Sequence, residues 1–339
     1  MGLRKPCLPI CLLLLFVPAR CRGAQNIQLV GVGSTTPISI YSLWFREFEK
    51  AHPNVHFSYI PSGSSDGVAM VSTGKADFGG TDAPMTNDQL AKAGVLQFPT
   101  VLGALVPVYN LPGVGPLKFS QRVLAGIYLG KIKRWNDPAL VRLNPGTQMP
   151  ARPIVVFHSA AGRGSTYVWS DFLSKVSEEW RTKVGVGTHI AWPTGTAADG
   201  NGNLADAVKH TPDSIGYVWF SYAVGRGLAY GQVQNAAGKF VTPDCSSVAV
   251  SVAAAAVNTM PADFRLSITN SPGERAYPIA SFTWLLVPQR LGSAEKREAM
   301  QQFLTWVLSN GQSYAATTGF APLPPALVTK ELAAIKNAD

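Results

Sequence analysis

The chain has 339 residues, 46% of them hydrophobic, and its 32 glycines and 25 prolines punctuate many short elements. This length and composition exclude an intrinsically disordered protein and favour two folded domains over one. The formal net charge of +9 at pH 7 suits an anionic ligand, but no long run of lysine and arginine is present, which argues against a nucleic-acid-binding protein.

Residues 1–23 have the pattern of a secretion signal peptide. Two basic residues precede an apolar run over 7–17, which is too short to span a bilayer as a stable helix. We expect cleavage after Gly23 and secretion of the mature protein. Lipoprotein attachment through Cys21 is a less favoured alternative, because Arg20 directly precedes that cysteine.

Cleavage at that place would remove three of the four cysteines and leave Cys245 alone. A single cysteine can form neither an internal disulfide nor a cysteine-based zinc site. The five histidines show no usable metal-ligand spacing, because Pro53 interrupts the i, i+4 pair of His52 and His56. We therefore expect no metal and no other cofactor.

After the signal, the sequence alternates between short strands and helices. Pro37 suits a first helical position, and apolar residues then recur at helical spacing until Pro53. Repeated strand, loop and helix units predict an α/β lobe whose ligand sites lie at the carboxyl ends of the strands. The predicted elements are strands at 27–30, 55–60 and 76–80, and helices that begin at Pro37 and at 64–66.

An apolar strand over 101–109 is predicted to cross into a second lobe, and a late strand over 279–287 to cross back. On this basis we assign 24–104 plus 277–339 to lobe I and 105–276 to lobe II. The remaining pattern predicts strands at 154–157 and 215–219, and helices after Ser120, from 136–138, over 165–172, over 203–210, after Ser293 and up to about Ala338.

Three segments place small hydroxyl residues beside glycine at the start of a predicted helix, at 33–36, 63–67 and 162–166. The backbone N–H groups of a first helical turn have no partner within the helix, and the helix dipole favours negative charge there. One such segment would be ordinary N-capping. Three of them in a two-lobed chain predict a convergent anion site.

Asp82 follows the strand predicted at 76–80 and would repel an anion bound at these helix starts. The repulsion becomes recognition if the ligand carries a proton to donate, as hydrogen phosphate does and sulfate does not at neutral pH. A ligand without that proton would leave a desolvated acceptor unpaired, which is strongly unfavourable. The alternative is that Asp82 only forms an Asx turn before Pro84.

The segment 63–67 also matches G-x-S-x-G, the nucleophile elbow of α/β-hydrolases, between a predicted strand and a predicted helix. Ser64 or Ser65 would then be the nucleophile of a hydrolase or a phosphatase-like enzyme. A triad would need one of three downstream histidines, His158, His189 or His210. Because a lone five-residue match is weak evidence, the enzyme reading stays an alternative from a different class.

Several stretches resemble one family in order and spacing from about residue 27 to the end. They are GVGSTTP at 31–37, GSSDG at 63–67, ADFGGTDAP at 76–84, GIYLGKI at 126–132, WND at 135–137, IGYV at 215–218 and YPIAS at 277–281. The family that they resemble is that of PstS-type periplasmic phosphate-binding proteins.

This resemblance implies a type II periplasmic-binding-protein fold, in which phosphate is buried between two α/β lobes joined by hinge strands and no reaction is catalysed. The implied partner is the membrane permease of a phosphate ABC transporter, and we expect a monomer that binds no nucleic acid. Family ligand contacts map by motif onto Thr35, Thr36, Ser64 and Asp82, with Asp82 as the acceptor of the phosphate proton.

On the second lobe the chain departs from the family pattern Arg-x-Asp-Gly-Ser-Gly-Thr, because residues 159–165 read SAAGRGS. The Arg and the Asp are missing from their usual places, and Arg163 stands where the family has Ser. We hypothesise that Arg163 supplies the guanidinium from a shifted position, while Gly164 N–H and Ser165 remain donors. The alternative is that Arg163 points to solvent and the protein is a receptor for a related oxyanion.

Overall fold

The computed structural model describes Gly2 and residues 26–255 and 260–336. Apart from Gly2, the signal peptide expected at 1–23 lies outside the described residues, as does the helix end expected near Ala338. Among the helices of the described ranges, none combines the length and the apolar character needed to cross a membrane.

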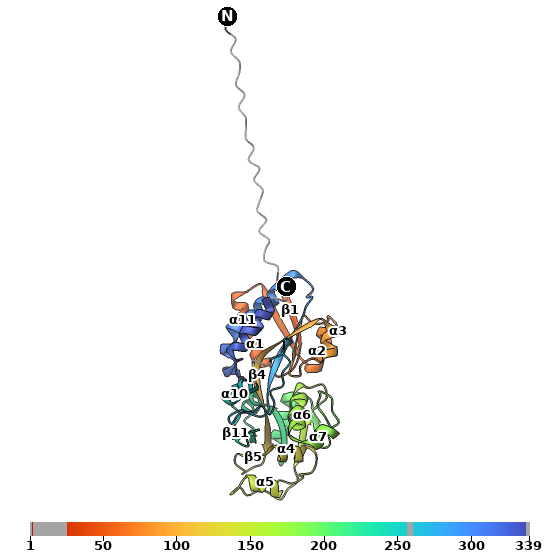
Figure 1. The fold of residues 1–339 in the computed structure, drawn as a ribbon, viewed down its shortest axis with the longest axis vertical. Coiled ribbons are helices and arrows are strands. Elements are labelled where there is room, and N and C mark those ends of the chain that lie inside the picture. The colour runs from red at the N-terminus through yellow and green to blue at the C-terminus, as the bar shows by residue number, and fades with distance from the viewer. Residues whose placement is uncertain (1, 3–25, 256–259, 337–339) are drawn as a thin grey trace.

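The upper part of the molecule in Figure 1 contains the first and the last segments of the described chain. Every strand and helix predicted there is present. Pro37 caps the first helix instead of opening it, since the helix begins at Ile38. The elements of this first lobe are β1 (Ile27–Gly33), α1 (Ile38–Ala51), β2 (Val55–Pro61), α2 (Ser64–Ser72), β3 (Phe78–Thr81), α3 (Asn87–Ala93), β12 (Ala280–Pro288), α11 (Ala294–Ser309), two 3₁₀ turns (Gly311–Tyr314 and Ala316–Thr318) and α12 (Pro325–Lys336).

The lower part contains the middle of the chain. The sequence predicted two of its strands and four of its helices, but not the helices Glu178–Lys183, Phe220–Gly225 and Cys245–Ala255 or the short strands. The elements of this second lobe are β5 (Lys118–Phe119), α4 (Gln121–Tyr128), α5 (Pro138–Leu143), β6 (Val155–Ser159), α6 (Gly164–Val176), α7 (Glu178–Lys183), β7 (Thr196–Ala198), α8 (Gly200–His210), β8 (Ser214–Trp219), α9 (Phe220–Gly225), β9 (Ala229–Tyr230), β10 (Gln232–Gln234), β11 (Phe240–Val241) and α10 (Cys245–Ala255).

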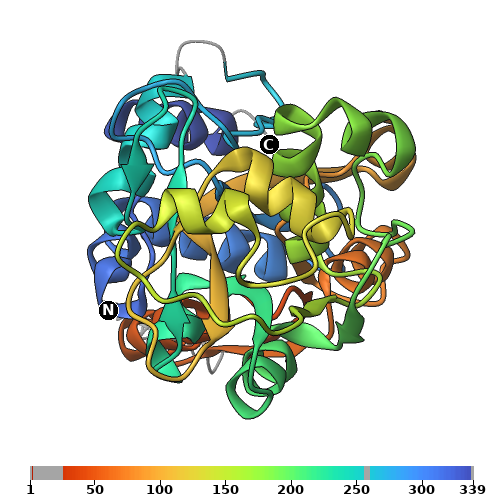
Figure 2. The ribbon, with the colours of Figure 1, turned by 90° about the horizontal axis from the view of Figure 1, so that it is seen from below.

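One strand, β4 (Val95–Asn110), runs through both parts (Figure 1). It pairs antiparallel with β12 through residues 95–104 and with β8 through 105–110. The strands therefore form one mixed sheet in the order β2-β1-β3-β12-β4-β8-β6-β7, with β9 also paired to β4, while β11, β10 and β5 form a separate small sheet. Seen from below, the yellow and green elements of the second lobe lie in front of the orange and blue elements of the first (Figure 2).

Packing of α1 fixes the position of the loop that precedes it. Its buried residues, Ile40, Tyr41, Trp44, Phe45 and Phe48, recur at the predicted helical spacing. The rings of Phe45 and Phe57 stack at 5.0 Å, which holds α1 against β2, and Trp44 Nε1 donates to the carbonyl of Gly311 at 2.8 Å. The start of α1 is thus anchored beside the carboxyl ends of β1 and β3.

Candidate functional site

Asp82 directly follows β3, a central strand between β1 and β12, and only 1% of its surface is exposed. Its Oδ2 accepts hydrogen bonds from Ser34 Oγ and Thr36 Oγ1, both at 2.6 Å, and its Oδ1 accepts one from Thr283 Oγ1 at 2.8 Å. The carboxylate is therefore held by hydroxyl groups from the β1–α1 loop and from β12.

Burial raises the pKa of the Asp82 carboxyl to about 6, and the three hydroxyl hydrogen bonds oppose that rise because they stabilise the ionised form. At pH 7 the group is still mostly a carboxylate. It is then a buried, negatively charged acceptor that gains from any further proton donor.

The first residue of α2 also contacts Asp82. Ser64, its first residue, is 1% exposed, and its Oγ accepts a hydrogen bond from the backbone N–H of Asp82 at 3.1 Å. Since the hydroxyl acts there as the acceptor, its own proton remains available for a ligand.

The start of α6 brings the second lobe into contact with Asp82 and Ser64. A Cβ added at Gly164 would lie 2.7 Å from Cβ and 2.9 Å from Oδ2 of Asp82, and it would also collide with Ser64 Oγ. Ser165, the next residue, is buried, and its Oγ lies 2.8 Å from Ser159 Oγ. The structure thus brings together the starts of α1, α2 and α6.

Arg163 caps α6, and its side chain is only 16% exposed. One guanidinium nitrogen donates to the carbonyl of Ser62, and another pairs with the carboxylate of Asp199. The solvent-pointing alternative for Arg163 is therefore wrong, because the guanidinium lies between the loops that precede α2 and α8. Contact between Arg163 and an anion stays a prediction.

Thr35 and Thr36 differ in what they can still donate. The Thr36 hydroxyl donates to Asp82, and the Thr36 backbone N–H donates to Ser34 Oγ at 3.1 Å. Thr35 Oγ1 instead accepts from Asn201 Nδ2 at 3.0 Å, which leaves its hydroxyl proton available. Thr35 is consequently the better placed of the two to donate a hydroxyl proton to a ligand.

Three further residues of the site, Thr283, Asn201 and Tyr222, were not predicted from the sequence, and Ser34 was predicted only as part of the segment 33–36. Tyr222 Oη donates to the carbonyl of Thr35 at 2.9 Å. No sequence pattern around Thr283 or Tyr222 indicates a ligand site, because strand pairing and the packing of the lobes bring these residues to the Asp82 cluster. Asn201, by contrast, stands beside Gly200 at a helix start, which resembles the signal of the other three segments except that an amide replaces the hydroxyl groups.

The geometry does not support the serine-hydrolase alternative. Ser65 Oγ donates to Thr188 Oγ1 at 3.2 Å, and Ser64 Oγ accepts from the N–H of Asp82, so neither of these hydrogen bonds involves a histidine. His158 is buried and stacked on Trp192, with ring centroids 4.5 Å apart. Neither serine is therefore paired with a histidine among the described contacts.

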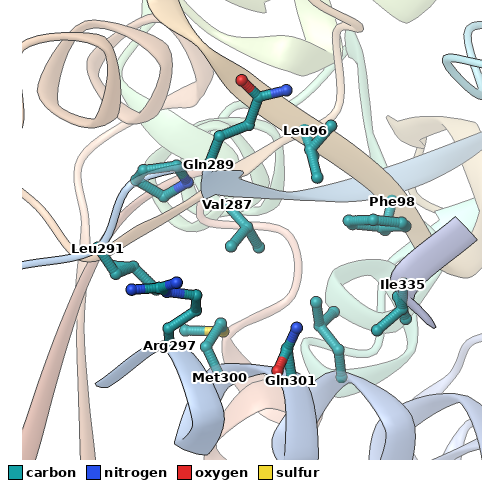
Figure 3. Close-up of a pocket in the computed structure, with 11 residues that line it drawn as sticks. Leu96, Phe98, Val287, Gln289, Leu291, Arg297, Met300, Gln301 and Ile335 are labelled. Carbon is teal, nitrogen blue, oxygen red and sulfur yellow. The ribbon is translucent and has the colours of Figure 1, made fainter. Parts of the chain in front are cut away.

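A metal centre and an apolar pocket are two other kinds of ligand site. Within the described ranges, no group of three histidine, cysteine, aspartate or glutamate residues is arranged to hold a metal ion. Figure 3 shows a pocket between β4, β12, α11 and α12 with a mainly apolar lining. It lies in the first lobe and shares no lining residue with the Asp82 cluster.

Comparisons with known proteins agree with this arrangement. The sequence matches the PBP superfamily domain over residues 22–311. A phosphate-binding protein PstS from Xylella fastidiosa is 38% identical over 313 residues, which cover 92% of this chain and 85% of the relative.

Solved structures share the fold. A phosphate-binding protein from Stenotrophomonas maltophilia superposes with a TM-score of 0.68 at 18% identity, over 90% of this chain and 93% of that one. An ABC-type phosphate transport receptor from Vibrio cholerae gives a TM-score of 0.58 at 17% identity, over 87% and 100%. The two-lobed α/β architecture is thus the type II periplasmic-binding-protein fold, and the chain belongs to the family of PstS phosphate-binding proteins.

Proposed function

We propose that this protein captures inorganic phosphate between its two lobes and delivers it to the permease of an ABC transporter. The names of its relatives support this assignment. The observation that carries it is the buried carboxylate of Asp82, held where the starts of α1, α2 and α6 meet.

A carboxylate at this position selects for a protonated oxyanion. Sulfate has no proton to donate at neutral pH, so its oxygens would face the Asp82 carboxylate without a hydrogen bond between them. The cost of a buried, unpaired charged acceptor exceeds that of a lost neutral hydrogen bond. Hydrogen phosphate donates its proton to Asp82 and avoids that cost.

The remaining phosphate oxygens need donors, and the structure offers them from both lobes. Thr35 and Ser64 retain hydroxyl protons, and the backbone N–H groups of Gly164 and Ser165 belong to the first turn of α6. Arg163 supplies positive charge from the second lobe. Donors on both sides make closure of the lobes depend on the ligand.

The division into lobes belongs to the same proposal. We assign 24–104 plus 277–339 to the first lobe and 105–276 to the second, with β4 and β12 as hinge strands, because β4 changes its partner between Ala104 and Leu105. The mature protein would begin after Gly23 and act in the periplasm as a monomer, without catalysing a reaction.

A specific observation favours a second candidate, a receptor for a related oxyanion. Ser159 stands where the family pattern has arginine, and the guanidinium of Arg163 is engaged by Ser62 and Asp199. A weaker positive charge at the site would favour anions of lower charge than a phosphate dianion.

Calorimetric titration of the ligand-stripped mature protein tests the assignment. We expect tight one-site binding of phosphate and no response to sulfate, measured at about pH 7 and about pH 5. Preference for sulfate, or binding of neither anion, would overturn the phosphate assignment and leave only the fold established.

A further inference from the structure

Asn201 is a buried polar residue that the phosphate assignment leaves unexplained. It lies in the first turn of α8, and only 3% of its surface is exposed. Its Nδ2 donates to Thr35 Oγ1 at 3.0 Å and lies 3.5 Å from Thr36 Oγ1. Its Oδ1 is buried and has no hydrogen-bond partner among the described residues.

An unpaired buried carbonyl is costly, because it has lost its hydrogen bonds to water and gained none within the protein. Such a group needs a donor from outside the described side chains, and a bound ligand is one source of that donor. The hydrogen bond to Thr35 fixes the orientation of the amide, so that Nδ2 faces the threonines and Oδ1 is left to accept.

Asn201 also lies close to the carboxylate of Asp82. Thr36 Oγ1 donates to Asp82 Oδ2 at 2.6 Å and lies 3.5 Å from Asn201 Nδ2, so one hydroxyl group separates the amide from the carboxylate. A Cβ added at Gly200 would lie 3.9 Å from Thr35 Cγ2. The start of α8 is thus a fourth helix start beside the proposed phosphate site.

The charges around Asn201 and Asp82 do not favour the binding of a dianion. Arg163 is paired with Asp199, and Asp82 adds a further negative charge. Burial raises the pKa of the neighbouring phenols of Tyr59 and Tyr222, so that they stay neutral. Among the described residues, the charge of Asp82 also acts on the buried phenol of Tyr41, and His189 Nδ1 lies 3.0 Å from Thr188 Oγ1.

We propose that Asn201 Oδ1 is a second proton acceptor of the site, so that the protein recognises the dihydrogen form of phosphate. One P–OH group donates to Asp82 and the other donates to Asn201. This inference rests on the proposed phosphate function. It makes Asn201 a specificity-determining residue, and the ligand a singly charged tetrahedral anion with two hydroxyl groups.

The test is the pH dependence of affinity for total phosphate at constant ionic strength. Above the second ionisation of phosphate, each pH unit removes about nine tenths of the dihydrogen form, so the Kd of the unchanged protein should rise about tenfold per unit up to about pH 8.5. N201A should bind more weakly near pH 6.5 and lose most of this slope, because the dianion no longer meets an unpaired acceptor.

N203A is the matched control, since Asn203 lies on the same helix, is exposed and donates to the carbonyl of Asp199. It should keep the slope of the unchanged protein. Equal slopes in N201A and N203A, or a flat slope in the unchanged protein, would overturn the role of Asn201. Absence of phosphate binding at every pH would instead overturn the proposed function.

A second measurement uses the unchanged protein alone, so it does not require any variant to fold. Calorimetric titration of the protein with phosphate near pH 8, repeated in buffers of different ionisation enthalpy, reports the number of protons taken up with each bound phosphate. Selection of the dihydrogen form requires uptake of about one proton per bound phosphate, because the dianion predominates in that solution. Uptake near zero would contradict the proposal.

Discussion

The carboxyl group of Asp82 combines burial with three hydroxyl donors, and these two features act in opposite directions on its ionisation. Burial dominates and raises its pKa to about 6. Keeping this buried carboxyl group ionised at pH 7 costs free energy in the ligand-free protein. A ligand that donates a proton to the carboxylate offsets that cost.

The stability of the ligand-free protein should therefore depend on pH through Asp82. Its pKa is raised from 3.8 in an unfolded chain to about 6 in the folded one, so the folded state binds the proton more tightly. The unfolding free energy then falls as pH rises through this window, by about 3 kcal/mol in all.

Asp82→Asn cannot ionise and should lose that decrease, as measured by urea unfolding at about pH 4 and about pH 7. A parallel pH dependence in the unchanged protein and in the variant would contradict the assigned pKa.

Gly164 allows the backbone of α6 to lie against Asp82 and Ser64. Since a Cβ at this position would lie 2.7 Å from Cβ of Asp82, Gly164→Ala should keep the lobes apart and weaken phosphate binding at least tenfold, about 1.4 kcal/mol. Calorimetry measures the loss. Gly292→Ala, where a Cβ meets nothing within 4 Å, is the matched control, and equal affinities in the two variants would refute the close approach.

At the scale of elements, the loop between β6 and α6 is where the chain departs from its family. It positions Arg163 as the N-cap of α6, with no side-chain capping bond, and directs the guanidinium toward the loop before α2. The same loop therefore links the lobes and carries the positive charge that the family pattern places elsewhere.

Arg163→Ala should weaken phosphate binding by an order of magnitude or more, because both the charge and the link between lobes are lost. Calorimetry at low and moderate salt measures the change. The control is Arg181→Ala, which removes an exposed pair with Glu178 on α7 and should bind as the unchanged protein does. Unchanged affinity in Arg163→Ala would show that Arg163 does not serve the ligand.

At the scale of the whole molecule, the two lobes share a single sheet through β4, and two of the hydrogen bonds between them involve neighbours of the residues that contact Asp82. Ser65 N–H donates to the carbonyl of Gly162 at 3.1 Å, and Tyr222 Oη donates to the carbonyl of Thr35. A ligand bound between these contacts would stabilise the closed arrangement over more open ones.

Phosphate should consequently compact and stabilise the protein. At a free concentration of about 100 times Kd, binding adds about 2.7 kcal/mol to the unfolding free energy. The melting temperature should rise, and the radius of gyration from small-angle scattering should fall. Sulfate at equal ionic strength should change neither, and an unaltered radius with phosphate would contradict closure on the ligand.

The α/β class, most of the longer elements and the hydroxyl-rich helix starts could be predicted from the sequence, because helical periodicity, capping residues and glycine positions are local signals. The groups that surround Asp82 could not be predicted in this way, because contacts between distant segments bring them together. Thr283 reaches the carboxylate through the pairing of β12 with β3, and Asn201 reaches Thr35 through the packing of the second lobe on the first. The partners of the Arg163 guanidinium could not be predicted from the sequence either, because both are distant along the chain: Asp199 lies elsewhere in the second lobe, and Ser62 lies in the first lobe.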